Sequence, residues 1–163
     1  MKRILTIVLQ IFLIAAFTSA VQAQSAPKEV VIGASIPKNG VLAAFGSYAG
    51  WGYKTAVAET NAKGGVMLKK YGKRVPIKLV VYDDESRPEL ATKNIERLVI
   101  KDGAHALLGS ATPPLVISGA VVAERERIPM VAALSPIRAF LGANKAGWKW
   151  TWNMFFDELE MTQ

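Results

Sequence analysis

The sequence has 163 residues, 51% of them hydrophobic, and this length and composition allow one domain with a sizeable core. Its formal net charge is +7, but the lysine and arginine residues are spread along the chain, which argues against a protein that binds nucleic acid. The chain contains no cysteine, so disulfide bonds, zinc–thiolate sites and thiol chemistry are excluded.

The first residues have the pattern of a secretory signal peptide. Lys2 and Arg3 precede an apolar run over residues 4–17, and small residues follow up to Ala23. The run is shorter than the roughly 20 apolar residues of a transmembrane helix. We therefore expect residues 1–23 to be a cleaved signal peptide. Because no cysteine follows it for lipid attachment, we expect a soluble protein of the periplasm.

The rest of the chain alternates predicted strands with predicted helices. Strands are predicted over residues 29–36, 75–82, 104–109 and 128–134, and helices over 47–63, after Ser86 and over 114–127. This order predicts an α/β fold, a three-layer sandwich in which helices cover both faces of a parallel sheet. Ligands of such sheets bind beyond the carboxyl ends of the strands.

Local signals predict where the helices begin and end. Ser47 is placed to cap the first helix, and Gly64 and Gly65 to end it. Ser86 and Glu89 have the spacing of a capping box at the start of the second helix.

Two further patterns concern the faces of single elements. The second helix carries apolar residues at helical spacing on one face: Ala91, Ile95, Leu98 and Val99. Near the C-terminus, Trp148, Trp150 and Trp152 alternate with polar residues, which predicts a half-exposed strand. Residues 155–163 are predicted to begin another helix.

Several residues are of types that occur in catalytic or metal sites, but their positions favour structural roles. No glycine-rich phosphate-binding motif follows a predicted strand. Asp83, Asp84 and Glu85 end a strand and could bind Mg²⁺, but we favour the interpretation that they cap backbone amides at the mouth of a cleft. The single histidine, His105, begins a strand and so lies away from the predicted ligand edge. We expect no enzyme activity, no metal and no cofactor.

Two loops at the predicted ligand edge carry hydroxyl groups. Ser110, Ala111 and Thr112 lead from the third strand into a helix, and Leu134 and Ser135 repeat the arrangement one strand later. A helix N-terminus has backbone N–H groups without intrahelical partners and suits a carboxylate. Ordinary capping by serine or threonine explains the pattern equally well.

A family resemblance rests on four stretches of sequence. They are residues 31–37 with 42–46, 80–98, 107–112 and 127–131. Together they resemble the type I periplasmic binding proteins, in particular the leucine/isoleucine/valine-binding branch that serves ABC transporters. The resemblance implies two similar lobes that close on a ligand by hinge motion. It assigns ligand contacts to six residues: Ser110, Ala111, Thr112, Leu134, Ser135 and Phe45.

The chain departs from the pattern of that family in its loops and its length. Pro113 and Pro114 stand where relatives usually have a pair of the serine–glycine type, and this removes hydrogen-bond donors. A standard branched-chain amino acid is therefore less expected as the ligand. By the resemblance, residues 24–153 form the N-terminal ligand-binding lobe and 154–163 begin a second lobe, so a truncated product is expected.

The function that the resemblance implies is that of the substrate-binding component of an ABC transporter for amino acids or amide-like molecules. Its partners would be the small-molecule ligand and the membrane permease, with no nucleic acid. A secreted α/β hydrolase is an alternative that would need a nucleophile and a base at the strand ends. A ligand-sensing domain of a receptor is another, and it would need a following membrane span or signalling domain.

Overall fold

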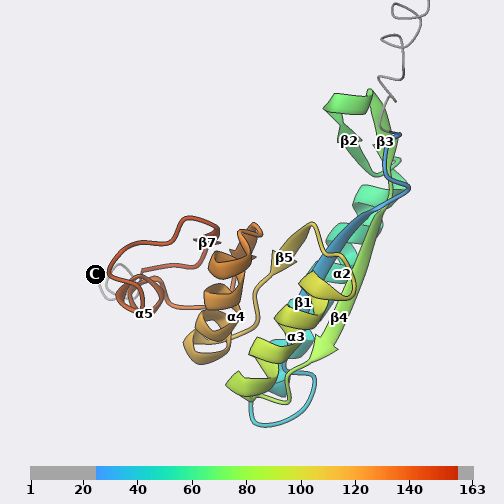
Figure 1. The fold of residues 1–163 in the computed structure, drawn as a ribbon. Coiled ribbons are helices and arrows are strands. Elements are labelled where there is room, and N and C mark those ends of the chain that lie inside the picture. Colours follow the sequence, from blue (N-terminus) through green and yellow to red (C-terminus); the bar gives the residue numbers. More distant parts are fainter. Residues whose placement is uncertain (1–24, 158–163) are drawn as a thin grey trace, which may run out of the picture.

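The computed structural model describes residues 25–157. The predicted signal peptide and residues 158–163 of the predicted last helix lie outside this range. Figure 1 shows the arrangement of the elements. The strands of the main sheet are β1 (Val30–Ile36), β4 (Ile77–Asp83), β5 (Ala106–Leu108), β6 (Met130–Ala132) and β7 (Thr151–Asn153). The helices are α2 (Ala43–Ala62), α3 (Pro88–Ile100), α4 (Pro113–Glu126) and α5 (Ile137–Gly142).

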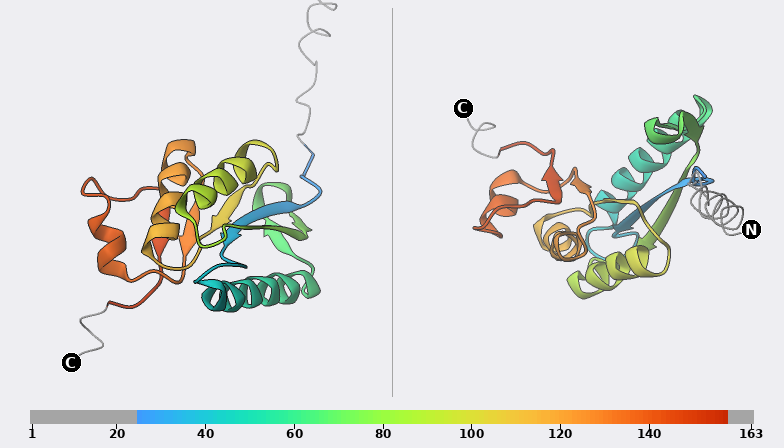
Figure 2. Two further views of the ribbon diagram at one scale, coloured as in Figure 1. Left: turned by 90° about the horizontal axis from the view of Figure 1, so that it is seen from below. Right: turned by 45° about the horizontal axis from the view of Figure 1, so that its top comes forward.

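The central feature is a parallel sheet with the strand order β4-β1-β5-β6-β7. Helix α2 lies on one face of this sheet, and α3 and α4 lie on the other (Figure 2). The predicted three-layer α/β sandwich is therefore confirmed. Since every strand runs in the same direction, all the carboxyl ends meet at one edge, as the binding-site prediction requires.

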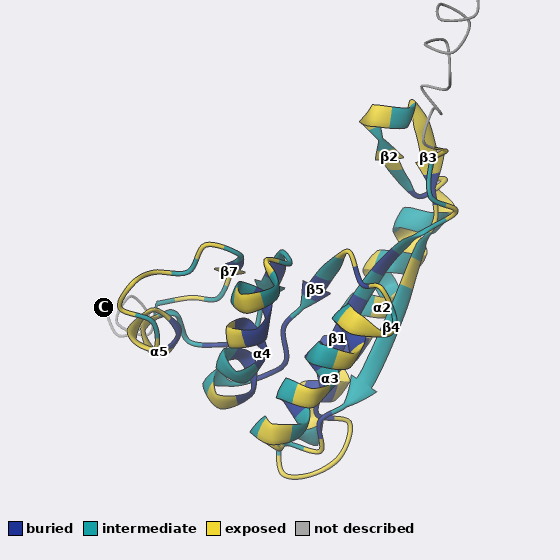
Figure 3. Ribbon diagram, viewed as in Figure 1, coloured by how far each residue is buried: buried dark blue, intermediate teal, exposed yellow. Residues whose placement is uncertain are grey.

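The main core lies between the sheet and the pair α3 and α4, where buried residues are concentrated (Figure 3). The predicted apolar face of α3 is confirmed, because Ala91, Ile95 and Leu98 are buried and Val99 packs against the same cluster. On the opposite face of the sheet, a smaller cluster joins α2 to β1 and contains Ala34, Ile36 and Ala49.

The predicted helix starts at Ser47 and Ser86 are wrong. Helix α2 begins at Ala43, so Ser47 lies inside it, and α3 begins after Arg87 without a side-chain cap. The Ser86 hydroxyl instead accepts from the backbone N–H of Leu42 at 3.0 Å and donates to the carbonyl of Asn39 at 2.9 Å. Ser86 therefore holds the loop before α2 rather than capping the helix that follows it.

A short antiparallel hairpin, which the sequence reasoning missed, lies between α2 and β4. It consists of β2 (Val66–Leu68), the 3₁₀ turn η1 (Lys69–Tyr71) and β3 (Lys73–Val75). The predicted second strand accordingly starts later, at Ile77, and runs to Asp83. The side chain of Asn61 fixes this start, since it donates to the carbonyl of Ile77 and accepts from its N–H, both at 2.8 Å.

The predicted tryptophan strand is shorter than its sequence pattern, because only Thr151–Asn153 pairs with β6. Trp148 lies outside the strand, stacks on Phe140 with ring centroids 4.8 Å apart, and donates its indole N–H to the Phe140 carbonyl at 2.9 Å. Within the strand, Thr151 is the buried residue and Trp152 is 53% exposed. Residues 155–157, the described part of the predicted last helix, are not helical.

No helix within residues 25–157 is long and apolar enough to span a membrane.

Candidate functional site

The loops that follow β5 and β6 lie side by side at the carboxyl edge of the sheet. Ala111 and Leu134 form a parallel bridge, and the N–H of Thr112 donates to the carbonyl of Leu134 at 2.8 Å. The structure therefore brings these two predicted loops together. Thr112 and Ser135 follow adjacent strands at the same edge, as the sequence predicted.

Thr112 has an unusual backbone conformation at the start of α4. Its φ of 66° and ψ of 154° fall in a region that is almost confined to glycine, and a β-branched residue held there is strained. Pro113 and Pro114 are the first two residues of α4 and carry no N–H. Among the first three residues of the helix, only Leu115 has a backbone donor, which reduces the capacity of this N-terminus to bind an anion.

Two hydroxyl groups at this edge have no hydrogen-bond partner among residues 25–157. They are Thr112 Oγ1 and Ser135 Oγ, and both are buried. A buried hydroxyl without a partner costs about 1–3 kcal/mol. A ligand reaches these atoms only where the side chains that cover them move. The two oxygens are nevertheless buried side-chain groups of the predicted site that no described residue uses.

Beside Leu134, a hollow of about 190 Å³ opens between α2 and the loop after β6. Its lining is largely apolar and consists of Tyr48, Ala49, Gly52, Tyr53, Ala133 and Leu134. Sites that enclose a small molecule usually measure about 300–1,000 Å³, so this hollow is too small to enclose such a ligand by itself. Sequence reasoning missed the tyrosines, although Tyr48, Gly52 and Tyr53 share one face of α2 by their spacing.

The remaining predicted residues lie elsewhere around this edge. Phe45 is in the first turn of α2 and is half exposed. It does not line the hollow beside Leu134. A larger hollow of about 330 Å³ flanks the other side of α2, where Lys38, Trp51 and Lys54 contribute to its lining, and it contains none of the six predicted residues.

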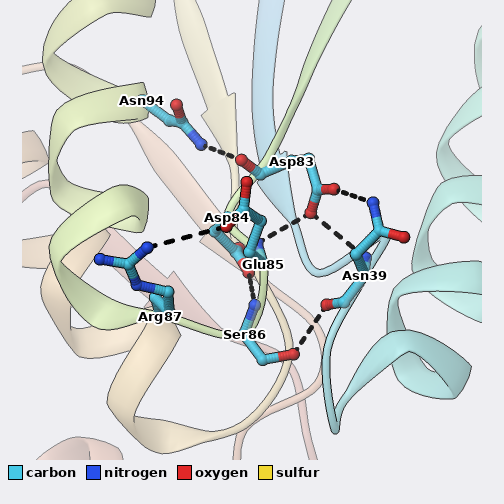
Figure 4. Close-up of polar contacts among 7 residues, drawn as sticks. All are labelled: Asn39, Asp83, Asp84, Glu85, Ser86, Arg87 and Asn94. Atoms are coloured by element: carbon cyan, nitrogen blue, oxygen red, sulfur yellow. Dashed lines mark hydrogen bonds and ion pairs between the residues drawn. The ribbon is translucent and has the colours of Figure 1, made fainter.

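The acidic residues at the end of β4 and just beyond it bind backbone and side-chain donors of the protein itself (Figure 4). Asp83 accepts from the N–H groups of Lys38, Asn39 and Glu85. Burial raises the pKa of Asp83, but these backbone bonds and the Asn39 amide lower it more, so its pKa lies below the ordinary value. The interpretation of Asp83 as a backbone cap is thereby confirmed.

Asp84 is buried, and its carboxylate accepts hydrogen bonds from Ser35, Ser110 and the N–H of Ser86. Burial raises the pKa of Asp84, and the hydrogen bonds offset part of that effect. The hydroxyl of Ser110 thus donates its single proton inside the protein. Direct ligand contact by Ser110 remains a prediction, and it concerns the other groups of that residue.

The histidine that a hydrolase site would use as its base lies away from the predicted ligand edge. His105 immediately precedes β5 at the amino edge of the sheet, and its Nδ1 accepts from the N–H of Val31 at 3.1 Å. It is therefore remote from Thr112 and Ser135. Among residues 25–157, no group of three or more histidine, aspartate or glutamate side chains could hold a metal ion.

The family model described as "Periplasmic binding protein" matches residues 29–157, which is most of the chain. The chain belongs to this family. Membership places it among ligand-binding proteins that work outside the cytoplasm.

Individual relatives agree with this assignment. An amino acid binding protein of Pseudomonas aeruginosa is 38% identical over 81 residues, which are 50% of this chain and 20% of that protein. The substrate-binding protein LivJ of a branched-chain amino acid transporter from Streptococcus pneumoniae, solved with isoleucine, superposes with a TM-score of 0.69. It is 26% identical, and the match covers 80% of this chain and 34% of LivJ.

A second solved structure shows the same fold. The leucine binding protein LivK of Thermotoga maritima is 23% identical, with a TM-score of 0.64, and the match covers 79% of this chain and 33% of that protein. These structures confirm the predicted resemblance to the leucine/isoleucine/valine-binding branch. The periplasmic binding protein described here therefore spans about a third of the length of its solved relatives.

Proposed function

We propose that this periplasmic binding protein contributes one ligand-binding lobe to the substrate-binding component of an ABC transporter for amino acids or related amides. The observation that carries the proposal is the hydrogen bond between Thr112 and Leu134, which holds two hydroxyl-bearing loops together at the carboxyl edge. Leu134 also lines the apolar hollow beside α2. Polar groups next to a small apolar surface suit a ligand with one polar end and one aliphatic end.

The loss of backbone donors at Pro113 and Pro114 influences which ligands are expected. With fewer N–H groups at the start of α4, recognition of the polar end depends more on Thr112 Oγ1 and Ser135 Oγ. A hydroxyl group can donate to a carboxylate or an amide oxygen, and it can accept from an amide N–H. Aliphatic amides are therefore expected ligands alongside aliphatic amino acids.

Binding by residues 24–163 is expected to be weak. The lobe covers one side of a ligand, and each 1.4 kcal/mol of lost contacts lowers the affinity tenfold. A micromolar site that loses half its contacts falls to the millimolar range or weaker. In the complete receptor, a second lobe would close over the ligand. The partner of that receptor would be the membrane permease.

The test is a titration followed by amide chemical shifts, which detect millimolar binding. Separate titrations would use L-leucine, L-isoleucine and isobutyramide. We expect saturable shifts at Thr112, Leu134, Ser135 and Tyr53. No shifts with any of the three compounds, or shifts confined to Lys38, Trp51 and Lys54 around the larger hollow, would contradict the proposal.

Export is the second part of the proposal. We propose that the chain reaches the periplasm through a signal peptide that is removed after Ala23. The intact mass of protein recovered from the periplasmic fraction should correspond to a mature chain that begins at Gln24. A mass that retains Met1 would count against export by this route.

A further inference from the structure

The buried carboxylate of Asp84 connects three parts of the ligand edge. Asp84 follows β4 and is 0% exposed. Its Oδ2 accepts from Ser35 Oγ of β1 at 3.2 Å and from Ser110 Oγ, just beyond β5, at 2.7 Å. Its Oδ1 accepts from the N–H of Ser86 at 3.1 Å. The carboxylate therefore ties the ends of β1, β4 and β5 together.

These hydrogen bonds matter for stability because the burial of a carboxylate costs free energy of hydration. No ion pair of Asp84 with a lysine or arginine occurs among the described residues. The three donors must therefore offset the loss of hydration. Asn94 of α3 extends the network by donating to Ser35 Oγ at 3.1 Å and to the carbonyl of Asp83 at 2.9 Å. The network is anchored on both α3 and the sheet.

The loop that Asp84 holds contains the strained residue of the site. Ser110 lies two residues before Thr112, whose φ of 66° needs support from both sides. Pro113 and the first turn of α4 fix the following side. On the preceding side, Ser110 is buried and its hydroxyl donates to Asp84 at 2.7 Å.

We propose that Asp84 is a positioning residue for ligand binding. Through Ser110 it holds the loop over residues 110–112 in place, so that Thr112 keeps its strained backbone and its hydrogen bond to Leu134. Asp84 itself does not contact the ligand. This inference rests on the proposed function for its effect on affinity, but the geometry of the loop can be measured without any ligand.

Two serine variants that delete one hydroxyl each separate positioning from stability. Ser110→Ala removes the anchor of the loop, and Ser35→Ala removes the other hydroxyl from the same Asp84 oxygen. Both side chains are buried, so both variants should lose similar stability. The readout is hydrogen exchange of two amides, that of Thr112, bonded to Leu134, and that of Gly109, bonded to Val131 within the sheet.

In Ser110→Ala, the hydrogen-exchange rate of the Thr112 amide is expected to rise by a factor about ten times larger than that of the Gly109 amide. In Ser35→Ala, the exchange rates of the two amides should change by the same factor. Equal changes at both amides in Ser110→Ala would overturn the inference. If Ser110→Ala does not fold, Asp84→Asn weakens the same anchor without a cavity, because a neutral amide oxygen accepts a weaker hydrogen bond from Ser110 than a carboxylate does. Equal exchange at the two amides there would overturn it as well.

The titration with L-leucine then connects positioning to binding. Ser110→Ala should weaken the binding of L-leucine about tenfold, and Ser35→Ala should leave it within about twofold of the wild type. If the wild-type chain binds none of L-leucine, L-isoleucine and isobutyramide, the proposed function fails while the exchange result still decides the positioning role. If Ser110→Ala binds L-leucine as tightly as the wild type, the positioning role in binding is refuted.

Discussion

The phenol of Tyr53 donates a hydrogen bond of 2.7 Å to the carbonyl of Gly109, and this bond joins the middle of α2 to the end of β5. Burial raises the pKa of Tyr53 to about 12, so the phenol remains a donor over the whole physiological range. The contact places α2 against the strand that leads into the loop of Thr112. The position of the hollow beside Leu134 therefore depends on Tyr53.

Tyr53→Phe keeps the ring and removes this hydrogen bond. We expect the free energy of unfolding to fall by about 1–3 kcal/mol, because the Gly109 carbonyl loses its partner. The raised pKa means that the folded state retains the phenol proton more tightly than the unfolded state. Stability from Tyr53 is thus present below about pH 10 and is lost as the pH approaches 12. Urea denaturation at pH 7 and 11 checks both effects, and an equal difference between the proteins at both pH values would contradict the second.

Ser135→Ala is expected to stabilise the protein and to weaken ligand binding. The hydroxyl of Ser135 is buried without a partner among the described residues, so its removal should raise the free energy of unfolding by about 1 kcal/mol. Thr151→Val is a matched control, because Thr151 Oγ1 is also buried without a described partner but lies at the amino end of β7. The control should stabilise the protein and leave the L-leucine titration unchanged. Weaker binding in both variants would indicate that the Ser135 hydroxyl has no specific role.

Gly46→Ala is expected to disturb the start of α2. A Cβ atom at Gly46 would lie 1.8 Å from the carbonyl oxygen of Pro37, so the helix or the loop must shift. We expect a loss of more than about 2 kcal/mol in the free energy of unfolding, which is in the range of overpacked sites. Gly52→Ala in the same helix meets no atom within 4 Å and should gain about 0.5–1 kcal/mol from helix propensity. Thermal denaturation compares the two variants. If Gly46→Ala is as stable as the wild type, the prediction is wrong and the loop at Pro37 can move away from the added methyl group at little cost.

The two adjacent aspartates should depend on pH in opposite directions. The lowered pKa of Asp83 contributes stability that is present above about pH 4 and is lost as the pH falls through its folded value. The raised pKa of Asp84 favours the folded state below about pH 4, and this contribution is lost as the pH rises through its higher folded value. The free energy of unfolding of the wild type, measured relative to that of Asp83→Asn, should therefore rise from pH 3 to pH 7. Measured relative to that of Asp84→Asn, it should fall over the same range. Urea denaturation across this range measures both differences, and parallel trends would contradict the assignment.

Much of the candidate site was predictable because parallel strands place their carboxyl ends together. The alternation of apolar runs and helical patterns was enough to put Thr112 and Ser135 at one edge. The pairing of their loops through Leu134 was not predictable, since a backbone hydrogen bond between loops leaves no residue pattern. The partner of Ser110 was hidden for a similar reason: Asp84 is 26 residues away in sequence, and its burial depends on the packing of three strands.

Local signals failed where a tertiary contact used the same side chain. The Ser86 hydroxyl holds the loop at Leu42 instead of capping α3, and Trp148 stacks on Phe140 instead of continuing β7. Sequence by itself determined the α/β class and the buried face of α3, because periodicity records which side of an element avoids water. The family followed from the resemblance of four stretches of sequence and not from periodicity. Only the tertiary structure decided which hydroxyls are used inside the protein and which remain unpaired, because a hydrogen bond depends on the positions of two groups that the folded backbone brings together.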